Sequence, residues 1–476
     1  MQPGEPAPSL RFQDIKSAAL EQNLANVGAD AAIGAAIVES THSKSCRSKW
    51  PSQALFERFA SMRSGGTPLP SIKSQCRSGR CWIFAALQCV TINMQRRYQL
   101  HPDFELSAAY IFYYNTLERA QTTLERFDAL RAERSVAHDR FLQMLCATPI
   151  EDGGQLCFFN EIVAKYGLCA RCCYAGSLHQ ENTVDLNKAA CDLCREGLLA
   201  IDEVHRSGEC RDTKQIRTRA IKRRTLEALQ RALDAMLGRP PTEVTATGIR
   251  AARDGSPLSW EADAVWTPQQ FATTVCGISG ETYVNLVHDP RHAYDAMYRV
   301  AYLTNLWNSP DYTYLNVDIA DVLSLVAKLV RAGFPVWFGC DVGKCFCRDT
   351  GILSTELLCH KSLFSGGPRL TKADRLVMGE SVSTHAMTIV DVVENADGRP
   401  DAFLVANSWG EETGHKGYIY MTADWAREFM FQICVPVDAL DHQPALRESL
   451  RHACTRQPVD LAPWDPMGTL ARSGRA

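Results

Sequence analysis

The chain has 476 residues, of which 46% are hydrophobic and 22% are charged. It can therefore bury a large core, and we expect two or three structural units. The formal net charge of -3 gives no overall attraction for polyanions, so nucleic acid is not the expected general partner.

The N-terminus, MQPGEPAPSLRFQD, lacks a basic start followed by an apolar run. No stretch approaches the roughly 20 apolar residues of a membrane span. The chain also carries 19 cysteines, an odd number, which favours reduced thiols over a disulfide framework. These features predict a soluble, cytoplasmic protein with no membrane partner.

A helix is predicted to begin near Cys81, in the stretch QCRSGRCW. A thiol at a helix N-terminus faces unpaired backbone N–H groups and the positive end of the helix dipole, so we expect the pKa of Cys81 to fall. Cys76 lies upstream in a predicted loop, and Cys89 lies two turns into the helix. Cys81 is therefore the predicted nucleophile, with Trp82 beside it. The apolar stripe that predicts the helix consists of Ile83, Leu87, Val90 and Met94.

Four cysteines further along have the spacing of a zinc site. They form two C-x2-C pairs separated by 18 residues, and four thiolates at such spacing bind zinc. The second pair, however, falls on an amphipathic helix predicted within 185–204, where cysteine packs as a small hydrophobe. Packing is the favoured interpretation and zinc the alternative. The four residues are Cys169, Cys172, Cys191 and Cys194.

A basic run at 211–224 contains seven basic residues and one acidic residue. We interpret this run as the solvated face of a helix rather than as a nucleic-acid-binding site, because the whole chain is slightly acidic. The following stretch, RTLEALQRALDAMLG, predicts a helix that ends at a Gly-Arg-Pro-Pro sequence.

A β-hairpin is predicted near the C-terminal end, and it would bring a histidine and an asparagine together. The first strand, STHAMTIVDVV, contains His385, and a turn is expected at Asp397-Gly398. The return strand leads to Asn407, whose amide oxygen can accept a hydrogen bond from one imidazole nitrogen. Trp409 is then placed to screen that bond from water.

The remaining catalytic requirement is a hydrogen-bond donor for the oxyanion of the tetrahedral intermediate. Gln75 lies close enough in sequence to supply it, since it precedes Cys81 by six positions. Its side-chain amide and the Cys81 backbone N–H can form an oxyanion hole, each donor being worth about 3 kcal/mol in the barrier. Cys81, His385 and Asn407 are thus the predicted catalytic residues, and Gln75 is the predicted oxyanion donor. No metal and no cofactor are implied.

The order Gln, Cys, His, Asn resembles that of the papain-like cysteine peptidases. Longer blocks are similar to the bleomycin hydrolase and aminopeptidase C family within that class, and they span about residues 70 to 471. The blocks are SGRCWIFAAL, EDGGQLCFFNEIVAKYGL, GFPVWFGCDVGK, LTKADRLVMGESVSTHAM, NSWGEETGHKGYIYM and PWDPMGTLA.

The resemblance implies an α+β, papain-like fold with two lobes: a helical lobe that carries the nucleophile helix, and an antiparallel β lobe. His385 follows Cys81 by 304 positions, whereas simple papain-like enzymes separate these residues by about 130 to 150, so a large, mainly helical insertion is expected. The predicted segments are an N-terminal segment with a hook-like part (1–70), the helical lobe (71–174), the insertion (175–300), the β lobe (301–440) and a C-terminal arm (441–476).

The resemblance also implies cysteine aminopeptidase activity on peptide substrates, in a homohexamer. In that family the C-terminal arm lies in the active-site cleft and its carboxylate anchors the free amine of the substrate, a role that falls on Leu470 and Ala471. Here five residues, RSGRA, follow Ala471. We therefore expect self-trimming to, or near, Ala471.

Other functions are left open by the residues alone. If the tail is not trimmed, a latent or endopeptidase-like hydrolase is the alternative. A catalytically silent scaffold and a zinc-dependent nucleic-acid-binding protein are alternatives of other classes. A further one is an enzyme of the same chemistry that acts on a different acyl substrate, such as a thiolactone or a drug amide.

Overall fold

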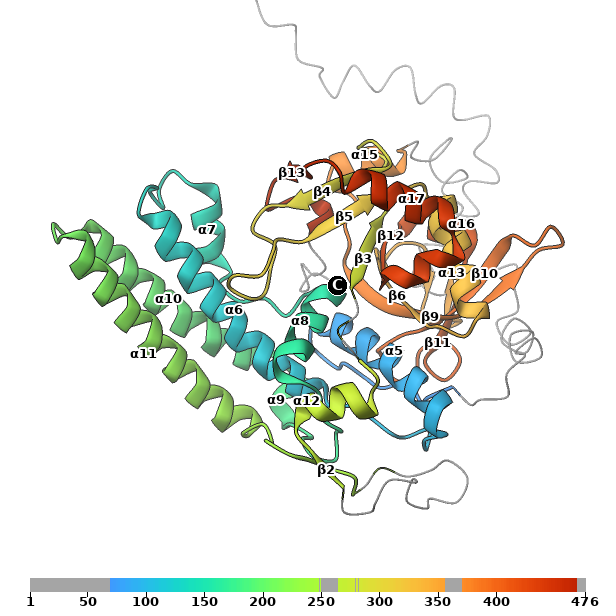
Figure 1. Cartoon of the computed structure of the whole chain (residues 1–476), viewed down its shortest axis with the longest axis horizontal. Coiled ribbons are helices and arrows are strands. Elements are labelled where there is room, and N and C mark those ends of the chain that lie inside the picture. The colour runs from blue at the N-terminus through green and yellow to red at the C-terminus, as the bar shows by residue number, and fades with distance from the viewer. Residues whose placement is uncertain are drawn as a thin grey trace, which may run out of the picture.

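The computed structural model describes residues 69–247, 249, 264–278, 280, 282–355 and 370–468. Helices dominate its first half and strands its second half (Figure 1). This mixed α and β content confirms the coarse fold prediction. Within the described ranges, no helix is long and apolar enough to cross a membrane.

The long helices come early in the chain. The helices are α5 (Cys81–Tyr98), α6 (Ala108–Arg131), α7 (Arg140–Ala147), α8 (Leu156–Tyr166), α9 (Leu178–Glu181), α10 (Val184–Arg206), α11 (Arg211–Leu237), α12 (Pro268–Gln270), α13 (Ile319–Arg331), α15 (Lys372–Val377), α16 (Ala423–Phe429) and α17 (Pro444–Ala453). A π-helical turn covers Phe271–Val275, and 3-10 turns cover Val437–His442 and Pro466–Gly468.

Eleven of the described strands form one sheet, in the order β13-β4-β5-β3-β12-β6-β9-β10-β11-β8-β7. Most neighbours are antiparallel; β13 with β4, β3 with β5 and β8 with β11 are parallel. The strands are β3 (Tyr283–Val287), β4 (Ala296–Val300), β5 (Thr313–Asn316), β6 (Val336–Cys340), β7 (Phe346–Cys347), β8 (Ile352–Leu353), β9 (His385–Glu394), β10 (Pro400–Ala406), β11 (Tyr418–Thr422), β12 (Met430–Pro436) and β13 (Val459–Leu461). A separate pair joins β1 (Val244–Thr245) and β2 (Val265–Trp266).

Helix α5 packs directly against strand β9, and this contact positions the site. The Thr388 hydroxyl donates to the Ala85 carbonyl at 2.9 Å. On the neighbouring strand β6, Trp337 Nε1 donates to the Trp82 carbonyl at 3.3 Å. Both tryptophans are buried. Since fully buried aromatic side chains contribute about 3 kcal/mol or more each, this junction holds the start of α5 firmly against the sheet.

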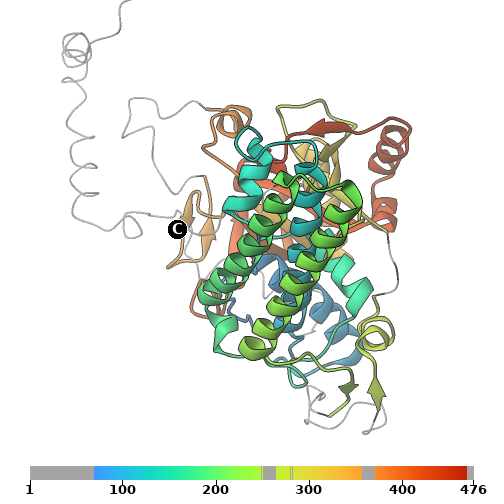
Figure 2. The same cartoon turned by 90° about the vertical axis from the view of Figure 1, so that its left-hand side faces the viewer.

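Helices α6, α10 and α11 pack together on one side of the molecule (green and cyan in Figure 2). A Cβ at Gly197 of α10 would lie 2.7 Å from the Thr225 hydroxyl of α11, so the absence of a side chain permits this close approach. Helix α11 ends at Leu237 before Gly238, which has a φ of 83°. The predicted end at the Gly-Arg-Pro-Pro sequence is therefore confirmed.

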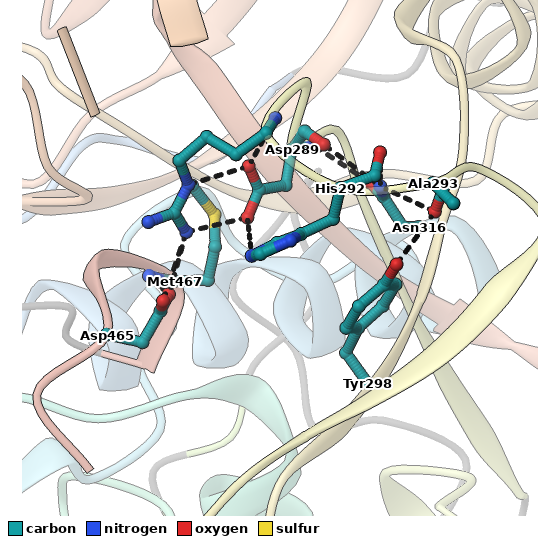
Figure 3. A network of polar contacts seen from close by, with 8 residues as sticks. Asp289, His292, Ala293, Tyr298, Asn316, Asp465 and Met467 are labelled. Atoms are coloured by element: carbon teal, nitrogen blue, oxygen red, sulfur yellow. Dashed lines mark hydrogen bonds and ion pairs between the residues drawn. The ribbon is translucent and has the colours of Figure 1, made fainter. Parts of the chain in front are cut away.

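The C-terminal segment is attached to the edge of the sheet formed by β13 and β4. Strand β13 pairs with β4, and Asp465 accepts from Arg291 Nη2 at 2.9 Å (Figure 3). The same guanidinium donates to both carboxylate oxygens of the fully buried Asp289, at 2.9 and 2.7 Å. Met467 is buried just beyond. The sheet edge, Arg291 and Met467 together hold the chain as far as residue 468.

The boundaries predicted for the five segments stay predictions. The observed helices and strands can be compared with the predicted insertion. The helices α10 and α11 fall within the predicted insertion at 175–300. Strands β3 and β4 fall within the same predicted segment but belong to the eleven-stranded sheet.

Candidate active site

Cys81 is the first residue of α5, as the apolar stripe predicted. Its side chain is buried, with the residue 2% exposed. The sulfur accepts hydrogen bonds from backbone N–H groups, including that of Ala386 on strand β9. Since Ala386 directly follows His385, the Cys81 sulfur lies beside the start of the strand that carries His385.

His385 and Asn407 are joined by a hydrogen bond. His385 opens strand β9, and Asn407 directly follows strand β10, the antiparallel neighbour of β9. His385 Nε2 lies 2.9 Å from Asn407 Oδ1, and the same oxygen accepts from the Ser408 backbone N–H at 2.8 Å. The amide oxygen is thus fixed, and the imidazole is held with Nε2 toward it. The predicted hairpin brings these two side chains together.

Trp409 covers the histidine. The two ring centroids lie 4.8 Å apart with an interplanar angle of 33°. The guanidinium of Arg348 lies over the Trp409 ring, 4.7 Å from the ring centroid. The indole therefore limits access of water to the bond between His385 and Asn407, and Arg348 adds a positive charge nearby.

Gln75 is held in a network that reaches the same loop as Asn407. Its Oε1 accepts from the Ser408 hydroxyl at 2.6 Å, and its backbone N–H donates to the Ser408 carbonyl at 2.7 Å. Its Nε2 donates to the Ser78 carbonyl. One hydrogen of the Gln75 amide is thereby engaged, and the second is left over; the oxyanion role of Gln75 stays a prediction.

Asp152 is a supporting residue that the sequence reasoning missed. Its carboxylate accepts from the Gly79 backbone N–H at 3.0 Å, and its carbonyl accepts from Trp82 Nε1 at 2.7 Å. It thus fixes the chain on both sides of Cys81. A Cβ at Gly154 would lie 2.5 Å from the Trp82 ring, so this position has no room for a side chain. The EDGG block contains both residues, but only the fold shows their partners.

The expected fall in the Cys81 pKa is wrong for the resting structure. Burial raises the pKa of Cys81 to about 11, although backbone N–H groups of Ala386 and Trp82 act in the opposite direction. Burial likewise lowers the pKa of His385 to about 4, against the effect of its bond to Asn407. Burial thus favours the neutral form of each group. The helix-terminus argument holds instead for the exposed Cys210, the N-cap of α11, whose pKa is lowered by hydrogen bonds from Thr213.

Acid is expected to destabilise the protein through two buried histidines. Burial lowers the pKa of both His288 and His385 from 6.5 to about 4. Below about pH 6.5 the unfolded chain binds protons that the folded chain does not, so stability falls as pH drops toward 4. Each histidine contributes up to about 1.4 kcal/mol per pH unit.

Urea-unfolding midpoints across this pH range measure the effect. His288→Asn keeps a side-chain N–H for the Val317 carbonyl, which lies 3.2 Å from His288 Nδ1, and should make the acid dependence clearly shallower. The matched control is His442→Asn at an exposed position, which should leave the slope unchanged. An identical slope in wild type and His288→Asn contradicts the prediction.

The four zinc-candidate cysteines do not gather as a set of metal ligands among the described residues. Cys191 donates to the Ile150 carbonyl at 3.4 Å, and Cys172 donates to the Thr247 carbonyl at 3.6 Å. Cys169 and Cys194 are fully buried among apolar side chains. In the described part of the chain, no three His, Cys, Asp or Glu side chains gather as metal ligands. Packing in the core accounts for the second pair, on α10.

The basic run lies on the first half of α11. Lys222 forms ion pairs with Asp128 at 2.9 Å and with Glu125 at 2.5 Å. Arg217 lies 2.6 Å from Glu209. Part of the positive charge is thus matched within the molecule. Leu470 and Ala471, the predicted anchoring residues of the arm, lie outside the described residues.

Comparison with known proteins identifies the family of the chain. The model of the Peptidase C1-like family matches residues 11–468. Aminopeptidase C from Lactobacillus delbrueckii subsp. lactis is 31% identical over 406 residues, which cover 84% of this chain and 86% of that protein. Human bleomycin hydrolase is 32% identical over 413 residues, 85% of this chain and 87% of that protein. The crystal structure of PepW from Lactobacillus rhamnosis superposes with a TM-score of 0.83 at 28% identity, covering 97% and 99% of the two chains. The chain belongs to the Peptidase C1-like family.

Proposed function

We propose that the protein is a cysteine aminopeptidase that removes N-terminal residues from peptides. One observation carries this proposal: the Cys81 sulfur lies beside the strand that begins with His385, and Asn407 holds that imidazole at 2.9 Å. A thiol, a base and a group that orients the base are the parts that thiol-based acyl transfer needs. The similarity to aminopeptidase C and bleomycin hydrolase supports the substrate class.

The proposed reaction starts from the neutral pair. As the substrate binds, the thiol proton passes to His385, and the Cys81 sulfur attacks the carbonyl of the first peptide bond. The imidazolium then protonates the leaving amine, and a thioester remains. His385 next deprotonates a water that hydrolyses the thioester. Asn407 orients the imidazole, while Gln75 and the Cys81 backbone N–H stabilise the oxyanion. This sequence uses no cofactor.

A panel of fluorogenic aminoacyl amides tests the proposal. Each amide is supplied with a free amine and in N-acetylated form. An aminopeptidase hydrolyses the free-amine forms, and the Cys81→Ala protein hydrolyses neither. Preference for the N-acetylated forms would instead support an endopeptidase-like enzyme.

The wider architecture is also part of the proposal. The helices before β3 would form one papain-like lobe with α10 and α11 as a large insertion, and the sheet would form the second lobe. We further propose a cytoplasmic homohexamer. Sedimentation measurements on the purified protein test the oligomeric state.

The C-terminal arm would set the preference for a free amine, with Leu470 and Ala471 placing the terminal carboxylate. The described chain is fixed as far as Met467 by its own burial and by the pair between Asp465 and Arg291. From there the remaining residues can extend by at most about 3.3 Å each. Five extra residues beyond Ala471 would therefore move the carboxylate by up to about 16 Å.

Self-trimming is the expected consequence. Mass spectrometry of active wild-type protein should show a chain that ends at, or near, Ala471. The Cys81→Ala protein, made in the same way, should keep RSGRA. Active wild type with an intact tail contradicts the prediction, and would make a latent or endopeptidase-like hydrolase the better proposal.

A further inference from the structure

A cavity of about 260 Å³ lies beside α5. It is lined by one helical stripe, Arg80, Phe84, Leu87, Gln88 and Thr91. Strand β9 contacts α5 at the Ala85 carbonyl, which accepts from Thr388, and Ala85 does not line the cavity. The cavity therefore adjoins the proposed active site at Asn407, although Cys81 and His385 do not line it.

Two buried donors from residues that line this cavity have no hydrogen-bond partner. They are Nη1 of Arg80 and Nδ2 of Asn407, and both residues are only 2% exposed. The other donors of Arg80 reach uncharged oxygens, the Ser78 hydroxyl at 3.0 Å and the Gln180 carbonyl. An unsatisfied buried donor costs about 1 to 3 kcal/mol, and more when it is charged. A ligand that accepts hydrogen bonds would remove this cost.

Positive charge at the rim adds to this preference for an acceptor. Glu105 is shared by two cations, with Lys73 Nζ 3.0 Å from one oxygen and Arg171 Nη1 2.8 Å from the other. Lys73 also lies 3.8 Å from Asp103, a side chain that is 71% exposed and therefore strongly screened by solvent. The charged residues that line the cavity are three cations, Lys73, Arg80 and Arg171, and two carboxylates, Glu105 and Glu181.

The rest of the lining is largely apolar, with Phe84, Leu87, Phe104 and Leu106. We propose that this cavity binds a small carboxylate that carries an apolar side chain, its carboxylate directed to Arg80 and Asn407 and its side chain to these four residues. Free apolar amino acids belong to this class. They are also products of the proposed aminopeptidase reaction, and only this identification of the physiological ligand rests on the proposed function.

A ligand bound in the cavity would affect the proposed active site through the side chain of Asn407. Asn407 accepts from His385 with its oxygen, at 2.9 Å, its Nδ2 has no hydrogen-bond partner, and the residue lines the cavity. The cavity is also lined by Ser74 and Cys76, which flank Gln75. A ligand here would therefore contact Asn407 and the loop that carries Gln75 without contacting Cys81 or His385, which do not line the cavity.

Calorimetric titration of the Cys81→Ala protein tests the site without any turnover. N-acetyl-leucine is the probe, because its blocked amine removes recognition of a free amine elsewhere. N-acetyl-leucinamide lacks the carboxylate and should bind at least about tenfold more weakly, since a hydrogen bond to a charged group is worth about 1.5 to 3 kcal/mol. Acetate lacks the apolar part and should lose a similar amount, since burying a leucine side chain is worth about 1.5 to 3 kcal/mol.

Lys73→Met and Arg171→Met remove the rim cations, whose side chains are 30% and 48% exposed, so the fold should tolerate both changes. Each should weaken binding of N-acetyl-leucine several-fold, and the double variant should weaken it by more than tenfold. Lys188→Met, which removes a cation that is 74% exposed on α10, is the matched control and should bind as the parent does.

The proposal is overturned if N-acetyl-leucine does not bind, or if the rim variants bind it as the parent does while their thermal melting is unchanged. It is also overturned if a crystal structure of the complex places the ligand in the cleft beside residue 81. Failure of the aminopeptidase assay alone leaves these measurements intact, so the two proposals fail independently.

Discussion

Replacing Cys81 by alanine is expected to lower kcat for a free-amine aminoacyl amide by on the order of 10⁶. The reason is that the thioester route disappears altogether, so only the binding and electrostatic contributions remain.

Asn407→Ala should act less severely, by on the order of 10² to 10⁴ in kcat with little change in KM. In that variant His385 keeps its place on β9 but loses the acceptor that holds Nε2 at 2.9 Å.

The matched control for the nucleophile is Cys89→Ala. Cys89 lies two turns further along α5, and its sulfur contacts the Thr388 hydroxyl of β9 at 3.8 Å. Its environment is thus similar, with burial that raises its pKa to about 12. This variant should retain near-normal kcat. If Cys89→Ala loses as much activity as Cys81→Ala, or if Cys81→Ala keeps a few per cent of the wild-type rate, the assignment of the nucleophile is wrong.

The local parts of the site were predictable from the sequence. The apolar stripe after Cys81 fixes where α5 starts, because helical periodicity depends only on neighbouring residues. The same holds for the hairpin, since the turn at Asp397-Gly398 sets which residues of the two strands approach each other. His385 and Asn407 are 22 positions apart, so their meeting is almost a local event.

The energetic character of the site was not predictable in this way. The helix terminus does place N–H groups near Cys81, but burial outweighs them and raises the pKa of the thiol to about 11. That burial comes from packing of α5 on β9, which joins residues about 300 positions apart. Asp152 and Arg348 were missed for the same reason, because their partners in the site are brought to them only by the tertiary fold.

The pair between Arg291 and Asp289 is the extreme case of such long-range structure, and it carries the largest expected effect on stability. Asp289 is fully buried and receives three hydrogen bonds from Arg291: two from the guanidinium at 2.9 and 2.7 Å, and one from the backbone N–H at 3.1 Å. The guanidinium extends the link to Asp465, 174 positions later in the chain (Figure 3). These charges raise the pKa of Arg291 further above its usual range.

Arg291→Met should destabilise the protein by about 3 to 5 kcal/mol, because a buried carboxylate is left without its cation. Thermal and urea unfolding of the variant measure this change. Combining Arg291→Met with Asp289→Asn should recover a substantial part of the loss, since the second change removes the uncompensated charge. Loss of packing alone would give no such recovery.

Arg299→Met separates the effect of burial from the effect of fastening the C-terminal segment. Arg299 pairs with Asp460 at 2.6 Å on the same segment, but these side chains are 41% and 59% exposed. Solvent screens such a pair, so its loss should cost less than about 1 kcal/mol. If Arg299→Met and Arg291→Met destabilise equally, attachment of the segment accounts for most of the lost stability. If only Arg291→Met has a large effect, most of the loss comes from the charge of Asp289, which is fully buried just after strand β3.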